Sequence, residues 1–357
     1  MDSYALFRLP GEREYTEMRQ TTGEPLMLDD VSSLNGHSGF VLAPFAVSNE
    51  CPVLLLQPDT IVRRRLAAIK PPFTEDKTPS DENGTGFYDM QNPVLERENN
   101  RVAYSKDFAA FHARICDGTF PKLVLARQSI DRLQETEEPR VLFERACRLY
   151  PNMFVALVSM PVGGTWLTAT PEILLEGDGG EYRTIALAGT MGLWGNTLWS
   201  EKNRSEQRYV ASYIEECIRG FSDECEKKGP YIVAAGDVCH LCTDFKFSLP
   251  DKSRLGDFLE QLHPTPAVCG LPKGLAMRFI LGNESTARRY YSGFMGPIGT
   301  DGTTHLYVSL RCMEICGNEY RLYAGGGLLA ESEEESEWNE TESKMQTIRR
   351  CFTKKIR

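Results

Sequence analysis

The chain has no long apolar run. It contains 357 residues, of which 41% are hydrophobic, but no segment approaches the roughly 20 consecutive apolar residues that a membrane helix needs. The opening stretch, MDSYALFRLPGEREY, also lacks the apolar core of a secretory signal peptide. We therefore expect a cytoplasmic protein that does not have a membrane as its partner.

Positive charge is also scarce. The chain carries 40 Lys and Arg residues against 50 Asp and Glu residues, so its formal net charge is -10. Nucleic acids and anionic membranes bind to basic surfaces, and we expect neither as a partner. A small anionic substrate remains compatible with this charge, because its binding needs only a local group of cationic side chains or a metal ion.

The 11 cysteines are odd in number and lie mostly within apolar segments. In a cytoplasmic chain they are most simply small buried hydrophobic side chains. Two close pairs, Cys239 with Cys242 and Cys312 with Cys316, leave open a zinc-binding or thiol-redox site as the alternative from another functional class. The chain has no second C-x-x-C pair, which argues against this alternative.

The expected elements point to an α+β fold. Apolar positions at helical spacing predict helices near 108–118, 141–149 and 200–220, and from Ser332 onward. Strand-like segments occur in runs without helices between them, which favours large mixed or antiparallel sheets flanked by helices. Residues 71–100 are rich in Pro, Asp, Glu, Asn and Gly, and we expect a loop there.

Two cations lie inside runs that otherwise read as buried strands. Lys122 follows FP in FPKLVLARQ, and Arg311 lies within HLYVSLRCMEI, which we expect to form one strand over 305–315. A buried cation is costly unless it is paired. Two of them on separate strands indicate a shared anionic partner, either internal acids or a carboxylated substrate.

The last helix places Glu337, Glu340 and Lys344 on one face, beside its buried apolar stripe. Glu201 opens an earlier helix. Carboxylates from two separate elements are what a magnesium site with oxygen ligands requires. The alternative is a solvated, acidic helix start, for which Ser332 and Glu335 would supply a capping box.

Three segments are rich in Gly and Pro: 263–272 (HPTPAVCGLP), 290–299 (YYSGFMGPIG) and 324–330 (AGGGLLA). Turns are the usual reason for such composition. Glycine also lets backbone N–H groups approach an anion closely. The residues by themselves therefore predict a site for an anion and Mg²⁺.

A set of motifs in one order along the chain is more specific than any single feature. The motifs are PKLVLAR, TPEILLE, LAGT, SEKNR, HLCT, LHPTPAVCGLP, YSGFMGPIG, VSLRC, LYAGGGLL and EWNETESKMQT. Over residues 101–352 the chain resembles the chorismate-utilising enzymes. The resemblance implies large, mostly antiparallel sheets packed face to face and flanked by helices. It also implies one compact domain, in which 1–100 joins the catalytic region 101–357.

Within this family, the chain resembles the members that use water as the nucleophile. These carry Lys at the position of Lys122, where anthranilate synthases carry Gln, and the chain has Ala188 where aminodeoxychorismate synthases carry a nucleophilic Lys. The resemblance implies conversion of chorismate to isochorismate, for menaquinone or siderophore biosynthesis. The alternative is a salicylate synthase, which also eliminates pyruvate. The resemblance further implies a monomer without a glutamine amidotransferase subunit.

The resemblance also assigns roles to residues. It implies that Lys122 is the general base for water, that Glu172 is the general acid for the leaving hydroxyl, and that His240 lies beside the substrate ring. Glu201 and Glu340 would hold Mg²⁺, with Glu337 acting through a water molecule. The residues implied to bind substrate are Ala188, Gly189, Thr190, Thr243, Ala267, Tyr291, Arg311, Gly325 and Lys344.

Overall fold

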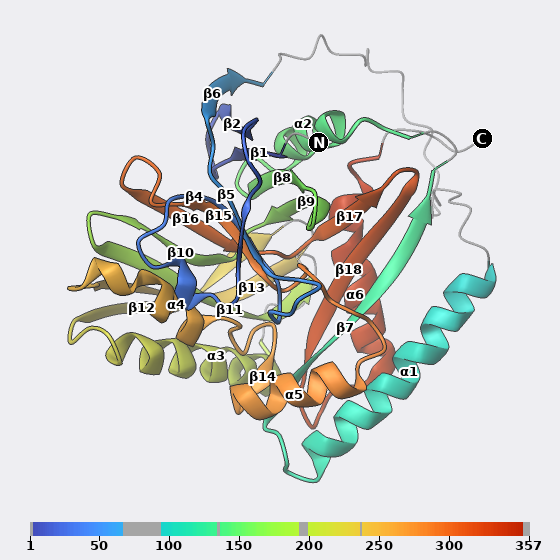
Figure 1. Cartoon of the computed structure of the whole chain (residues 1–357). Helices are drawn as coiled ribbons and strands as arrows, with labels where there is room; N and C mark the ends of the chain where they lie inside the picture. Colours follow the sequence, from blue (N-terminus) through green and yellow to red (C-terminus); the bar gives the residue numbers. More distant parts are fainter. Residues whose placement is uncertain (1–2, 67–93, 134–135, 193–198, 236–237, 353–357) are drawn as a thin grey trace, which may run out of the picture.

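The computed structural model describes residues 3–66, 94–133, 136–192, 199–235 and 238–352. Over these residues the chain forms two nine-stranded sheets in which every pairing between neighbouring strands is antiparallel (Figure 1). The first sheet has the order β14 (Gly270–Leu271), β7 (Lys122–Arg132), β18 (Glu319–Leu328), β17 (Cys312–Cys316), β9 (Gly164–Thr170), β8 (Phe154–Met160), β1 (Ser3–Arg8), β2 (Glu14–Gln20), β6 (Thr60–Arg65).

The second sheet has the order β12 (Cys225–Ala235), β13 (Val238–Ser248), β11 (Glu181–Gly192), β10 (Ile173–Asp178), β16 (Thr303–Val308), β15 (Phe294–Ile298), β4 (Gly39–Ala43), β5 (Val53–Leu56), β3 (Leu26–Leu28). The described helices are α1 (Val94–Cys116), α2 (Pro139–Leu149), α3 (Glu201–Arg219), α4 (Leu255–Leu262), α5 (Lys273–Asn283) and α6 (Glu334–Arg349), with short 3-10 turns η1 (Ser32–Leu34) and η2 (Lys252–Arg254). The predicted α+β fold is confirmed, and strands from the first 65 residues belong to both sheets.

The two sheets pack face to face because several strands are apolar on both sides. In β8, Phe154 and Ala156 join the cluster between the sheets, whereas Val155 and Leu157 join the cluster under α2 and α6. Alternate side chains of a strand point to opposite faces. A continuous apolar run therefore supplies two hydrophobic layers at once, and Phe154 stacks on Tyr307 of the other sheet at 4.2 Å between ring centroids.

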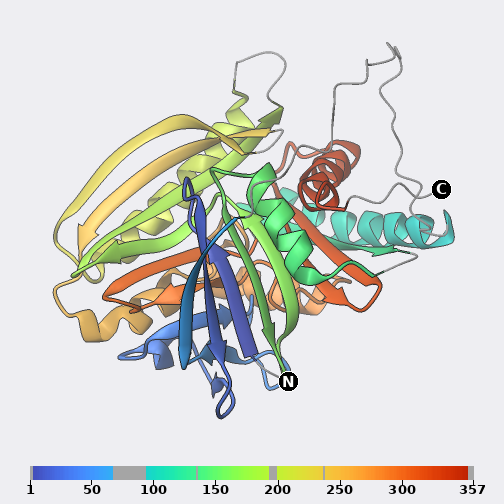
Figure 2. The same cartoon turned by 90° about the horizontal axis from the view of Figure 1, so that it is seen from above.

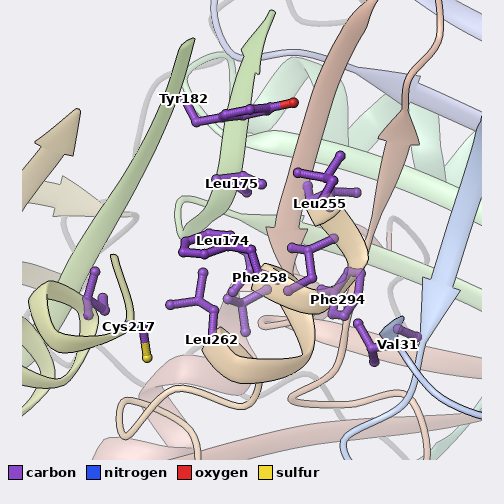
Figure 3. Close-up of a cluster of buried hydrophobic side chains, with 14 of the residues drawn as sticks. Val31, Leu174, Leu175, Tyr182, Cys217, Leu255, Phe258, Leu262 and Phe294 are labelled. Carbon is purple, nitrogen blue, oxygen red and sulfur yellow. The ribbon is translucent and has the colours of Figure 1, made fainter. Parts of the chain in front are cut away.

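Helices cover the outer faces. Phe258 and Leu262 of α4 lie beside Leu174 of β10 and Phe294 of β15 (Figure 3), in a cluster that also contains the inner face of α3. Seen from above, β12 and β13 lie at one side of the molecule, and α1 with α6 at the other (Figure 2). In the part of the chain that the structure describes, no helix is long and apolar enough to span a membrane.

One strand prediction was wrong. Residues 305–315 form two strands, β16 and β17, which belong to different sheets. The chain crosses between the sheets at Ser309–Arg311, and Arg311 takes a left-handed backbone conformation with φ of 45°. Arg311 therefore lies in the crossing segment rather than on a strand face. Its side chain donates to His240 of β13, in the second sheet.

Two further predictions need correction. The expected loop over 71–100 is helical from Val94, where α1 begins, and residues 67–93 lie outside the described part. Ser332 and Glu335 do not form a capping box: Ser332 Oγ accepts the N–H of Leu329 and donates to Glu337 Oε1 at 2.8 Å. Ser332 thus fixes a carboxylate of α6 instead of capping the helix.

Candidate active site

A pocket lies between the two sheets and is bordered by α3 and α6; its empty volume, which includes space open to solvent, is about 590 Å³. The lining residues that the sequence had singled out are Glu172, Ala188, Gly189, His240, Ala267, Tyr291, Arg311, Gly325 and Lys344. They come from distant parts of the chain, and the fold brings them to one place.

Lys122 is fully buried, with 0% of its side chain exposed, and forms an ion pair with Glu206 at 3.0 Å. It is not itself a lining residue, whereas Glu206 is. A side chain at Gly327 would prevent this pair, because its Cβ would lie 2.0 Å from Glu206 Oε1 and 3.0 Å from Lys122 Cε. The third glycine of AGGGLLA therefore serves close packing beside the pocket.

Glu206 is a residue that the sequence analysis missed. The predicted ligand Glu201 lies on the first turn of α3, is 72% exposed and pairs with Arg208; the structure does not bring it to the pocket. Glu206 is buried and precedes Val210 and Ile214 at spacings of four residues, on the inner face of the same helix. That spacing was the signal available in the sequence.

Glu172 lies between β9 and β10 and lines the pocket. Burial raises the pKa of Glu172 to about 7, against the opposing influence of the positive charges on Arg311, Lys122 and Lys344. A carboxyl group with this pKa holds a proton at neutral pH for much of the time. It can therefore donate that proton to a bound molecule.

His240 is held in one tautomer. Arg311 donates from Nη2 to His240 Nε2 at 3.0 Å, and His240 Nδ1 lies 3.0 Å from the carbonyl oxygen of Gly189. Because a guanidinium can only donate and a carbonyl can only accept, Nδ1 carries the proton. Burial and the charges of Arg311 and Lys344 lower the pKa of His240 to about 3. The neutral imidazole thus orients the guanidinium of Arg311 beside the pocket.

Two carboxylates of α6 lie close to lysines. Glu340 pairs with Lys344 at 2.6 Å, and Glu337 accepts from Lys202 and from Ser332. Burial acts to raise the pKa of Glu340, but the charges of Lys344 and Lys202 lower it to about 2. Glu340 is consequently ionised at neutral pH.

Oxygen Oε2 of Glu337 is buried and has no hydrogen-bond partner among the described residues. A Cβ at Gly326 would lie 2.9 Å from this oxygen and 3.9 Å from Glu340 Oε1, so the second glycine of AGGGLLA makes room for both side chains. Buried, unpaired carboxylate oxygen is unusual in native structures. Together with ionised Glu340, it provides the hard oxygen donors that a divalent cation such as Mg²⁺ prefers.

The remaining predicted residues have clear positions. Lys344 donates to the carbonyl of Gly325 at 2.8 Å. Thr243 is buried and accepts from Gln207 at 3.1 Å, away from the pocket surface. Thr190 pairs with His240 across β11 and β13, and its side chain lies outside the described part of the structure.

The cysteines do not support the zinc alternative. Cys239, Cys242 and Cys312 are buried thiols without disulfides, and Cys316 is partly exposed. No group of three or more His, Cys, Asp or Glu residues with metal-binding geometry occurs within the described ranges. Cys242 and Cys312 belong to the hydrophobic cluster between the sheets, which agrees with their interpretation as small apolar side chains.

The fold and pocket can be compared with known proteins. Residues 54–353 match the family described as chorismate binding enzyme, and the chain belongs to that family. Among curated relatives, isochorismate synthase EntC of Escherichia coli (strain K12) is 31% identical over 242 residues, covering 65% of this chain and 62% of EntC. Isochorismate synthase DhbC of Bacillus subtilis (strain 168) is 33% identical, covering 73% of this chain and 69% of DhbC.

Solved structures have the same architecture. DhbC from Bacillus anthracis matches with a TM-score of 0.80 at 22% identity, over 98% of this chain and 96% of that one. MenF, the menaquinone-specific isochorismate synthase from Escherichia coli, matches with a TM-score of 0.76 at 22% identity, over 98% of this chain and 89% of that one. At these identities the structures establish the fold, and the predicted face-to-face antiparallel sheets are those of this family.

Proposed function

We propose that the protein is an isochorismate synthase, which adds water to C2 of chorismate and releases the C4 hydroxyl. The observation that carries the proposal is the pocket around Glu172, a carboxyl group whose pKa is raised to about 7 beside Arg311 and Lys344. This site offers one proton donor and two fixed cations, which suits a substrate with two carboxylates and a hydroxyl leaving group. The EntC and DhbC relatives carry the same activity in their names.

In the proposed reaction, Lys122 accepts a proton from the water that attacks C2. Its side chain is completely buried and lies beside Glu206, which lines the pocket. Glu172 gives its proton to the C4 hydroxyl, which leaves as water, so that water is both consumed and released. Arg311, held by neutral His240, and Lys344 bind carboxylate oxygens of the substrate.

We assign the metal site to Glu206, Glu337 and Glu340, replacing the expected Glu201. In the described residues the three carboxylates do not form a ready-made group of metal ligands, and each of them pairs with a lysine. Support for Mg²⁺ comes from the orphaned buried oxygen of Glu337 and from ionised Glu340, while Glu206 lines the pocket beside them. When bound, Mg²⁺ would neutralise charge on the substrate carboxylate during departure of the hydroxyl. We also expect a cytoplasmic monomer without an amidotransferase partner.

The test is product analysis. Purified protein is incubated with chorismate and MgCl₂, with and without ammonium chloride, and the products are identified by chromatography and mass spectrometry. Isochorismate without pyruvate, unaffected by ammonium, is the expected result. Salicylate with pyruvate would assign the protein to the salicylate synthases, and an aminated product would contradict the role of water as nucleophile.

A further inference from the structure

Lys202 is a lysine that the proposed reaction does not use. It is the second residue of α3, and its ammonium group donates to Glu337 Oε1. It lies four residues before Glu206, so the two share one side of the helix. Lys202 is 22% exposed, whereas Glu337 is 2% exposed. A cation from the protein itself therefore occupies a carboxylate assigned to the metal.

Lys202 lies where negative charge gathers. A Cβ at Gly326 would lie 2.9 Å from Glu337 Oε2 and 3.9 Å from Glu340 Oε1, so the carboxylate that Lys202 binds lies close to that of Glu340. Like charges held together in a buried site repel one another strongly. Lys202 thus compensates for the negative charge that α3 and α6 bring together.

Lys344 also pairs with one of these carboxylates, but it is less free to leave. Its ammonium group donates to the carbonyl of Gly325 and lines the substrate pocket. Lys202 is not a lining residue, and within the described part of the chain its ammonium group donates to Glu337. Its partial exposure gives the flexible side chain a route to solvent.

We propose that Lys202 is a resident counter-ion, which occupies the carboxylate cluster in the absence of metal and is displaced when Mg²⁺ binds. The inference rests on the proposed function, because it takes Glu206, Glu337 and Glu340 as the metal site. Lys202 then has two consequences: it keeps the metal-free site assembled, and it weakens the intrinsic affinity for the metal by competing with it.

The experiment measures metal binding directly, without substrate or turnover. MgCl₂ is titrated calorimetrically into metal-free wild type and into Lys202→Met, which keeps the length of the side chain and removes its charge. We expect Lys202→Met to bind Mg²⁺ on the order of tenfold more tightly. Lys202→Arg keeps the charge and should retain wild-type affinity. Arg204→Met is the matched control, since it removes a cation from an exposed position of the same helix turn, and should also behave as wild type.

Thermal melting provides an independent readout. In EDTA, Lys202→Met should unfold at a lower temperature than wild type, and excess MgCl₂ should close the gap. Lys202→Gln, which can still hydrogen-bond to Glu337, replaces the Met variant if that variant does not fold. Equal or weaker Mg²⁺ binding by the charge-free variants, with measurable binding by wild type, would overturn the counter-ion role alone. Absence of Mg²⁺ binding by every protein would overturn the metal assignment itself.

Discussion

Glu201 and Glu206 lie on the same helix and offer a matched pair of substitutions. Glu206→Gln removes the carboxylate that lies 3.0 Å from fully buried Lys122. Leaving one member of a buried ion pair without its partner costs about 3–5 kcal/mol. Glu201→Gln removes an exposed carboxylate that pairs with Arg208 at the surface, and we expect its stability to match that of wild type.

The expected shift in melting temperature follows from chain length. Globular proteins unfold with an entropy of about 2.1 cal/mol/K per residue, or roughly 0.75 kcal/mol/K for 357 residues. A loss of about 3–5 kcal/mol therefore lowers the melting temperature of Glu206→Gln by roughly 4–7 °C. Calorimetric titration should in addition show Mg²⁺ affinity reduced by at least about 100-fold, because a direct ligand matters more than its supporting residues.

The comparison also defines the result that refutes this reasoning. Unchanged Mg²⁺ affinity in Glu206→Gln, together with weakened affinity in Glu201→Gln, would restore Glu201 as the ligand. Melting temperatures that are equal in the two variants would mean that the Lys122–Glu206 pair contributes little to stability. Circular dichroism at low temperature checks that each variant is folded before either comparison is made.

Three further outcomes are expected. Glu172→Gln should lower kcat by at least about 100-fold while chorismate still binds. The rate of the wild-type protein should fall as pH rises through about 7, where Glu172 loses its proton. A pH–rate profile that is flat in this range would contradict the role of Glu172 as the acid. Gly327→Ala should disrupt the Lys122–Glu206 pair and lower both stability and turnover. The control Gly282→Ala should be neutral, because nothing lies within 4 Å of the added Cβ. Equal melting temperatures of these two variants would refute the packing argument. Lys122→Ala should abolish turnover and leave equilibrium binding of chorismate measurable, and residual turnover near the wild-type rate would exclude it as the base.

Glu172 also links pH to stability. Its folded-state pKa of about 7 lies above the ordinary glutamate value of 4.5. Between these two pH values the folded protein therefore keeps a proton that the unfolded chain has lost. The contribution of Glu172 to stability is therefore fully present below about pH 4.5 and is lost as pH rises through about 7. In Glu172→Gln this contribution to the pH dependence should vanish, which unfolding curves at several pH values can measure.

Much of the architecture could be predicted because local pattern and burial agree. The run over Phe154–Met160 is apolar except for Ser159, and a strand between two packed layers needs such a composition. The spacing of Val210 and Ile214 likewise marks the inner face of α3. The division of 305–315 into two strands could not be read in the same way, because the apolar run continues while the chain changes sheets, and only backbone geometry at Arg311 marks the crossing.

Without the family resemblance, the residues alone pointed to the site chiefly where a charged group interrupts an apolar run. Lys122 was found because a buried lysine demands a partner. The identity of that partner depends on how α3, which packs on β11 and β13, places the Glu206 side chain beside Lys122 of β7. Glu201 attracted attention because acids favour the first turn of a helix, and the same preference explains why it lies at the surface. Helical phase, rather than residue type, separates these two glutamates.

The central claim is that solvent water supplies the new hydroxyl group of the product. The most direct test runs the reaction of chorismate with the wild-type protein and MgCl₂ in water enriched in ¹⁸O, and measures the mass of the isochorismate formed. The account predicts incorporation of one ¹⁸O atom at C2 in each product molecule, with release of the original C4 oxygen. Isochorismate without the label would mean that the hydroxyl moves within the substrate, and failure to form isochorismate would contradict the proposed function.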